Sequence, residues 1–559
     1  MYKTLFRLLS VMILPGFMFG QIDYDKVKEA TDVLFLNDVY VHNSGDTTFT
    51  MQDIIIQDGI IKQMGGSLEA PYNARTLKVD SSYVYPSFID MMSHLGVKKE
   101  ERKEDPRVKF PGFPPNDVAG ITPEWKLTGK YDTKDGGIKS YRAAGFGMAH
   151  IVPRGRMLPG QSSLISLKSE DMVLDEGVAT YMQFTGARRM YPSTVIAIMA
   201  KWRDLFNNAA YLSEHQDIFN KSPLGTPRPK KDLMLESLIP VTKKEQAVFT
   251  RTESIKSVFR ALELEAELDY QLVLANAEVV DDAIAKIKAQ NVPVVLSLAL
   301  PKAEKEKDKK GDKAEKKDNK DKAVEHPQKE ELAQRKRESI ERYESQAGLL
   351  EDAGHKFAFS TMDLKSKDFK SNLNRMINAG LSKAGALDAL TINAAKLLEI
   401  DDVAGSVEQG KLAYLFVSNK PYFNEGAHIG HTIVDGNWLE HPKKEKKKAK
   451  AGTGSGISGE WSYEIAIPED ERSGTITIEK ADDDYSVTVF DQNQTDTEFT
   501  GNDVSYNGST LTFTITIEDG GTLIVNFTMN FEGDSYEGFI SIDGLGEFPM
   551  QGQRITSPE

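Results

Sequence analysis

The chain has 559 residues, which is enough for two or three domains with large hydrophobic cores. Its formal net charge of -15 argues against a nucleic acid or an anionic membrane as its partner, because both require a basic surface. The sequence contains no cysteine, so disulfides, thiolate metal sites and a cysteine nucleophile are excluded.

The first twenty residues have the pattern of a secretory signal peptide. Lys3 and Arg7 precede a short apolar stretch, and the sequence turns polar at Gly20-Gln21. The apolar stretch is too short to cross a bilayer comfortably, although an uncleaved membrane anchor is the alternative. The pattern predicts an exported protein, periplasmic or secreted, that has no membrane span once residues 1–20 are removed.

Residues 30–85 read as a series of short strands that form the first part of a β-sandwich. Asp58-Gly59 stands between two runs rich in isoleucine. An Asp-Gly pair in this setting is a strong signal for a hairpin.

From residue 86 to about residue 390, short apolar strands alternate with helical stretches. Such alternation indicates a parallel sheet, and the length fits a barrel with its chemistry at the C-terminal ends of the strands. The expected strands are 147–152, 270–274, 292–297 and 356–360, and the expected helices are 280–290 and a longer one from Glu330 to Gly354. The latter helix has Ile340, Tyr343, Ala347 and Leu350 on one face.

Two segments interrupt the folded regions. Residues 302–329 are a Lys/Asp/Glu tract with almost no apolar side chains, which predicts a disordered insertion because such a segment cannot bury a core. Residues 443–456 are rich in lysine and then in glycine and serine, which predicts a flexible linker.

Residues 457–559 have the composition of an all-β domain. Several runs alternate threonine or charged residues with apolar ones, and Asn-Gly and Asp-Gly pairs separate them. A small antiparallel barrel or sandwich is expected, with Trp461, Ile465 and Ile467 at the start of its core. The domain could carry an interaction function of its own, or it could be a spacer or a stabilising cap.

Several stretches resemble the amidohydrolase superfamily, in particular its imidazolonepropionase-like branch. The resemblance covers roughly residues 30–440 and is weak between 165 and 350. The matching stretches are Ile55–Gly65, Tyr85–Gly96, Gly145–Pro153, Leu158–Ser162, Leu381–Gly410 and Thr432–Asn437. The resemblance implies a (β/α)8-type barrel at 86–390, whose flanks 30–85 and 391–442 join in one β-sandwich.

The resemblance also implies a metal site, but several ligand positions have changed. The family's H-x-H motif on the first barrel strand reads Met92-Ser93-His94, and the strands 272–277 and 294–298 carry no histidine. Met362 stands where the family has its catalytic aspartate, and Asp363 follows one residue late. A thioether is a poor replacement for imidazole on a hard or borderline metal ion.

These changes leave His94 as the candidate metal ligand and Asp363 as the candidate catalytic residue. Lys201 and His150 are weaker candidates, and Asp90, Asp363 and Glu278 could provide a pair of carboxylates. The expected cofactor is none, or one weakly bound divalent metal ion, with zinc the first choice.

Two functions stay open. The first is a catalytically silent relative that binds a small molecule or acts beside a motif-bearing hydrolase partner. The second is a divergent hydrolase that acts on carbon–nitrogen bonds in non-peptide or cyclic amides.

Overall fold

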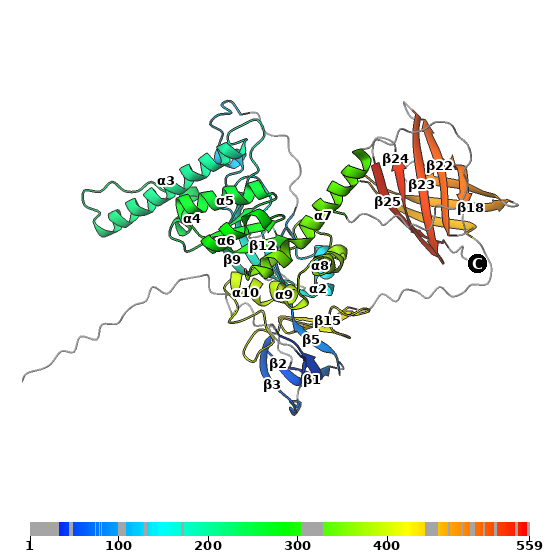
Figure 1. Ribbon diagram of the computed structural model, residues 1–559, viewed down its shortest axis with the longest axis horizontal. Coiled ribbons are helices and arrows are strands. Elements are labelled where there is room, and N and C mark those ends of the chain that lie inside the picture. The colour runs from blue at the N-terminus through cyan, green and yellow to red at the C-terminus, as the bar shows by residue number, and fades with distance from the viewer. Residues whose placement is uncertain are drawn as a thin grey trace, which may run out of the picture. The chain divides into compact units, whose positions relative to one another are not determined.

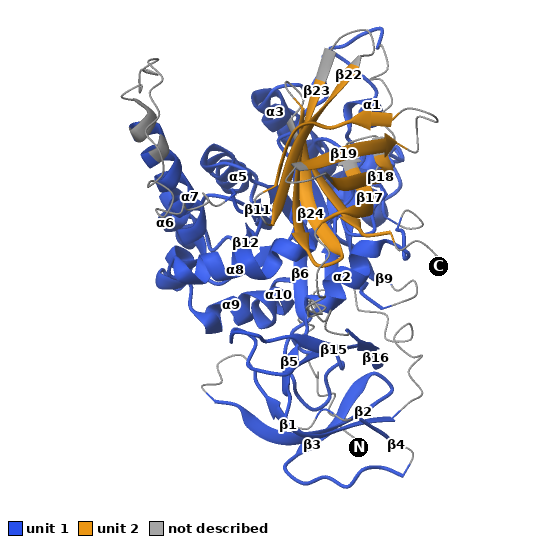
Figure 2. Cartoon of the chain, turned by 90° about the vertical axis from the view of Figure 1, so that its right-hand side faces the viewer, with its two compact units in different colours: residues 1–443 blue, residues 444–559 orange. Residues whose placement is uncertain are grey.

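The computed structural model describes residues 33–43, 48–72, 74–77, 79, 81–98, 108–127, 131–168, 173–302, 328–441, 457–467, 470–481, 484–491, 498–506, 509–518, 522–542 and 546–555. The expected signal peptide, most of the charged insertion and the expected linker lie outside these residues. The chain divides into two compact units, residues 1–443 and 444–559 (Figure 2). Among the described residues, no helix is long and apolar enough to cross a membrane.

The two flanks of the barrel join in one eight-stranded sheet at one end of the first unit (Figure 1). Strand β5 of the N-terminal flank pairs antiparallel with β14 of the C-terminal flank. The strands are β1 (Val33–Val41), β2 (Thr50–Gln57), β3 (Ile60–Gly65), β4 (Ala74–Leu77), β5 (Tyr83–Pro86), β14 (Leu415–Ser418), β15 (Ile429–Val434) and β16 (Asn437–Glu440). The β2–β3 turn has positive φ at Asp58 and Gly59, as the Asp-Gly hairpin predicts.

A second eight-stranded sheet forms the barrel. Its strands are β6 (Phe88–Ser93), β7 (Phe146–Ile151), β8 (Gly160–Ser166), β9 (Val173–Gln183), β10 (Ala247–Arg251), β11 (Leu272–Ala277), β12 (Val294–Ser297) and β13 (Phe357–Ser360). The last strand lies beside the first, and the Ser360 hydroxyl donates a hydrogen bond of 2.8 Å to the carbonyl of Met92. The (β/α)8-type barrel is therefore confirmed in outline.

One strand departs from the regular pattern. Strand β8 is antiparallel to both of its neighbours, whereas the other neighbouring strands in the ladder are parallel. The segment between β7 and β8 contains no helix, because a turn is enough to reverse the chain into an antiparallel neighbour. The expected strands correspond to β7, β11, β12 and β13, whereas β8, β9 and β10 were not predicted.

Helices cover the outside of the barrel, and apolar side chains fill its inside. The helices are α1 (Asn116–Ala119), α2 (Gly136–Ala143), α3 (Val195–Lys221), α4 (Leu233–Thr242), α5 (Ile255–Leu268), α6 (Ile284–Gln290), α7 (Gln328–Asp352), α8 (Phe369–Asn378), α9 (Lys383–Leu390) and α10 (Ile392–Leu397). The outer core joins helical residues such as Trp202 and Leu262 to strand residues such as Leu274. On α7, Ala347 and Leu350 are fully buried, as their helical spacing predicts.

The second unit is a nine-stranded antiparallel sheet. Each strand pairs with the next within β17–β20 and within β21–β25, and β25 pairs back to β17, which gives an up-and-down meander. The strands are β17 (Gly459–Ile467), β18 (Asp470–Ala481), β19 (Asp484–Asp491), β20 (Glu498–Thr500), β21 (Asn502–Tyr506), β22 (Thr510–Glu518), β23 (Thr522–Glu532), β24 (Ser535–Ile542) and β25 (Gly546–Gln553). Trp461 is fully buried in its core together with Ile465. The predicted all-β domain is confirmed.

The second unit is also strongly acidic. Residues 457–559 contain 21 aspartates and glutamates but only three lysines and arginines. The net charge of the chain therefore resides in this unit.

Candidate functional site

Two of the polar residues that the sequence singled out lie at the C-terminal ends of the barrel strands. His94 follows β6, and Asp363 follows β13. Asp363 has a positive φ of 62°, so the backbone turns directly after Met362. His94 also lies within electrostatic range of Asp363. Both residues thus lie at the C-terminal end of the barrel, whereas their roles as metal ligand and catalytic residue stay predictions.

The two methionines lie buried beneath this end. Met92 and Met362 are 0% and 1% exposed, and both pack in the apolar cluster inside the barrel with Tyr181 and Phe249. A metal ion needs three or more protein ligands, and these two positions supply apolar side chains instead. Among the described residues, no group of three His, Asp or Glu side chains is placed to hold a metal ion. The residues present do not fit the metal site that the resemblance implies.

His94 is held as a neutral imidazole. Its Nδ1 lies 2.9 Å from the carbonyl oxygen of Val152, so Nδ1 carries the proton and Nε2 is left as an acceptor. Burial lowers the pKa of His94 to about 4, and the positive charges of Arg154 and Arg251 act in the same direction.

Arg251 brings a positive charge into the barrel mouth. It ends β10 two residues after Phe249, so both side chains project from the same face of that strand, toward the inside of the barrel. Its Nη2 donates to Asp363 Oδ2 at 2.6 Å and lies 2.7 Å from Glu253 Oε1. The Arg251 side chain is only 18% exposed, which strengthens both ion pairs relative to surface pairs.

Two buried polar atoms beside these ion pairs lack a hydrogen-bond partner among the described residues. They are Nε of Arg251 and the hydroxyl of Tyr181. Tyr181 is 1% exposed, and its hydroxyl contacts the Arg251 side chain without reaching full hydrogen-bond geometry. Buried polar groups are normally hydrogen-bonded, so these two atoms mark a place where water or a ligand is expected.

The three carboxylates that could have formed a pair have separate roles. Asp90 is fully buried and accepts hydrogen bonds from the Thr361 amide and hydroxyl at 3.0 and 2.6 Å, so it joins β6 to the end of β13. Burial raises the pKa of Asp90. Glu278 belongs with Asp363 at the mouth, where burial and the nearby Glu253 raise the pKa of Glu278.

The weaker candidates do not belong to this site. Lys201 lies on helix α3, where it pairs with Asp204 at 3.0 Å, so it is not a residue of a barrel strand. His150 is fully buried on β7, with Nδ1 3.0 Å from the Met91 carbonyl and Nε2 2.6 Å from the Ser162 hydroxyl. Since Nδ1 must donate to the carbonyl, the Ser162 hydroxyl donates to Nε2. His150 therefore links strands and is not a ligand.

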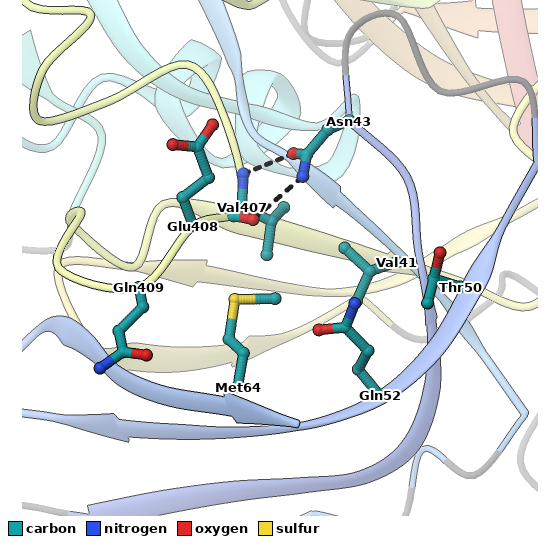
Figure 3. Close-up of a pocket in the computed structure, with 8 residues that line it drawn as sticks. All are labelled: Val41, Asn43, Thr50, Gln52, Met64, Val407, Glu408 and Gln409. Carbon is teal, nitrogen blue, oxygen red and sulfur yellow. Dashed lines mark hydrogen bonds between the residues drawn. The ribbon is translucent and has the colours of Figure 1, made fainter. Parts of the chain in front are cut away.

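A pocket of about 310 Å³ lies in the sandwich, away from the barrel mouth (Figure 3). The side chain of Asn43 forms two hydrogen bonds with the backbone of Val407 at its rim. The pocket is lined by Val41, Asn43, Thr50, Gln52, Met64, Val407, Glu408 and Gln409. Glu408 is the one ionisable side chain in this lining, so the pocket offers no catalytic pair.

Arg251, Glu253 and Tyr181 were missed by sequence reasoning. They lie in the stretch where the resemblance is weak, on or directly after strands that were not predicted. The available signal was Ala247-Val-Phe-Thr-Arg251, a short apolar run that ends in a cation where a barrel strand would open into the mouth.

Together, the barrel, the mouth and the sandwich built from both flanks define a fold of the amidohydrolase type. Residues 281–439 match the family model described as "Amidohydrolase family". A comparison with curated proteins found no match. Residues 281–439 are therefore similar to the amidohydrolase family, and the fold is of the amidohydrolase type, whereas the imidazolonepropionase-like branch stays a prediction.

Solved structures share this fold at low sequence identity. An amidohydrolase from Thermotoga maritima is 19% identical with a TM-score of 0.57, and the match covers 73% of this chain and 100% of that one. A dihydropyrimidinase from Brevibacillus agri is 12% identical with a TM-score of 0.40, and the match covers 73% of this chain and 95% of that one. The first comparison supports the fold alone, and the second is too distant to carry an argument.

Proposed function

We propose that this chain is an exported member of the superfamily that has lost metal-dependent hydrolysis and binds a small molecule at its barrel mouth. The observation that carries the proposal is the burial of Met92 and Met362 at two ligand positions, inside an apolar cluster. Restoring a metal would require polar side chains at these two places and a rearranged core beneath them.

Electrostatics at the mouth support the same conclusion. Arg251 places a guanidinium beside Asp363, the carboxylate that a metal ion would otherwise use. A divalent cation would have to compete with that guanidinium for Asp363 and would be repelled by it. Among the described residues, His94 is the histidine at this mouth, and one histidine does not hold a metal ion.

The second candidate is a divergent hydrolase of carbon–nitrogen bonds. What favours it is the presence of an acceptor nitrogen on His94 together with Asp363 and Glu278 at one end of the barrel. Such a set could transfer protons if a substrate and a water molecule were positioned between the groups.

Export and a partner belong to the same proposal. The order of charged, apolar and small residues at 1–20 favours export, and N-terminal sequencing of the mature protein would test it. We include a motif-bearing hydrolase as the partner, because a barrel without its own metal site can act as the accessory subunit of an active hydrolase. Co-purification from the native host would test this association.

Metal analysis tests the loss of the metal site. Protein purified without added metal should contain far less than one zinc or manganese per chain by plasma mass spectrometry. Introducing Met92→His together with Met362→Asp should raise zinc affinity. The matched control is Met92→Leu with Met362→Leu, which changes the same two buried positions but adds no metal ligand.

A direct assay separates the two candidates. The wild-type protein should not hydrolyse a panel of cyclic amides, with or without zinc. Stoichiometric metal in the wild-type protein, or turnover that His94→Ala abolishes, would support the divergent hydrolase instead.

A further inference from the structure

The barrel mouth contains an unusual balance of charge for a site without a metal ion. Arg251 and Arg154 supply two positive charges, and Glu253, Glu278 and Asp363 supply three carboxylates. The carboxylate of Asp135 also lies within electrostatic range of Arg154. His94 adds no charge near neutral pH because the pKa of its imidazole is lowered to about 4. Carboxylates therefore outnumber cations in this mouth.

Hydrogen-bond donors are nevertheless left over. Both ion pairs of Arg251 use Nη2, and its buried Nε has no partner among the described residues. The nearby hydroxyl of Tyr181 contacts the Arg251 side chain, but it does not reach full hydrogen-bond geometry with any described residue either. Leaving a buried donor without a partner is unfavourable, so an oxygen acceptor at this edge is favoured.

We propose that the mouth is a metal-free binding site for a small zwitterion of the α-amino acid class. The carboxylate of the ligand accepts from Arg251 and Tyr181, and its ammonium group lies against Glu278, Glu253 and Asp363. This inference rests on the proposed function, because a metal ion at the mouth would occupy the same groups.

Charge selects the zwitterion over its two halves. A simple anion would satisfy the donors, but it would add a negative charge where carboxylates are already in excess. A simple cation would match the carboxylates but leave Arg251 Nε and the Tyr181 hydroxyl without an acceptor. A molecule that carries both groups meets both needs without changing the net charge of the site.

The test is calorimetric titration of the full-length protein, treated with EDTA, with glycine, L-alanine and L-leucine. Acetate and methylamine are the controls, because they are the two halves of glycine. At least one amino acid should bind saturably, and both halves should bind at least tenfold more weakly. Removing metal should not change the affinity.

Variants locate the site. Tyr181→Phe keeps the buried ring and removes the hydroxyl, and it should weaken binding about tenfold or more, since hydrogen bonds to charged groups contribute about 1.5–3 kcal/mol. The matched control is Tyr270→Phe, because Tyr270 is also buried, its hydroxyl contacts Trp202 and not Arg251, and it packs in the outer core. Glu278→Gln should weaken the binding of the amino acid more than the binding of acetate.

The experiment separates a failure of the zwitterion site from a failure of the proposed function. If no amino acid binds, or if Tyr181→Phe binds as well as Tyr270→Phe, the zwitterion site is wrong while the loss of metal can still hold. If the purified protein contains stoichiometric metal and EDTA abolishes binding, both proposals are wrong.

Discussion

At the scale of single residues, the first unit contains a buried ion pair between Lys168 and Asp435. Lys168 Nζ lies 3.1 Å from Asp435 Oδ2, and the two side chains are 8% and 0% exposed. Lys168 follows barrel strand β8, and Asp435 lies in the β15–β16 turn of the sandwich, so the pair joins the barrel to the sandwich.

We predict that Lys168→Met destabilises the first unit by about 3–5 kcal/mol, because it removes the buried ammonium group that pairs with the Asp435 carboxylate. Lys201→Met breaks a partly exposed pair with Asp204 and should cost about 1 kcal/mol or less. Urea unfolding of the full chain, monitored for the first unit, measures both. Equal effects of the two substitutions would show that the buried pair has no special role.

His150 should make the barrel sensitive to acid. Burial lowers the pKa of His150 to about 4, so in the folded state it stays neutral where an unfolded histidine is already protonated. The unfolded state therefore binds more protons between about pH 6.5 and pH 4, and stability falls as the pH falls through this window. The contribution of His150 to the free energy of unfolding is fully present above about pH 6.5.

The expected loss from His150 between pH 7.5 and pH 4.5 is about 2–3 kcal/mol. His150→Gln removes this titration and should flatten the dependence by that amount, although it lowers stability at neutral pH. Denaturant unfolding at the two pH values gives the comparison. An unchanged pH dependence in the variant would contradict the assignment.

The positions of some residues of the site could be predicted from the sequence. His94 and Asp363 follow strands whose sequences resemble a known family, so they could be assigned to the mouth. That Asp363 pairs with a guanidinium could not be predicted, because it depends on Arg251, more than a hundred residues earlier on an unpredicted strand.

At the scale of elements, strand β8 escaped prediction for a physical reason. Strand β8 reads Gly-Gln-Ser-Ser-Leu-Ile-Ser and is completely buried. Its burial depends on hydrogen bonds such as Ser162 to His150, whereas pattern reading detects apolar residues at regular spacing. Strands such as β12, with Val294-Val-Leu, were visible because their burial is apolar.

Closure of the barrel between β6 and β13 also depends on polar contacts. The Asp90 carboxylate accepts two hydrogen bonds from Thr361 and has no access to solvent. Thr361→Val should destabilise the first unit by about 1.5–3 kcal/mol, because a hydrogen bond to a charged group is lost in the core.

Thr122→Val is the control for this prediction, since Thr122 is also buried but its hydroxyl makes only long hydrogen bonds of 3.3 and 3.5 Å. It should cost less than Thr361→Val in the same unfolding experiment. A larger loss from Thr122→Val would argue that volume and shape, not the Asp90 contact, determine the effect.

At the scale of the whole molecule, the second unit should fold by itself. Its core is built only from residues of 457–559, with Trp461, Phe513 and Phe527 among the buried side chains. A fragment of residues 444–559 should therefore unfold cooperatively in urea. Trp461 is its one tryptophan, so fluorescence reports directly on that core. A fragment with exposed tryptophan emission in water would contradict this prediction.

The acidity of the second unit has a consequence for the behaviour of the chain in solution. With 21 acidic and three basic residues in 457–559 and a total net charge of -15, the remainder of the chain is close to neutral. Near-neutral bodies attract one another at close range, whereas a tethered polyanion adds mutual repulsion that is screened by salt. The second unit acts in this respect as a colloidal stabiliser, and light scattering should show repulsion between molecules at low ionic strength that disappears as salt is added.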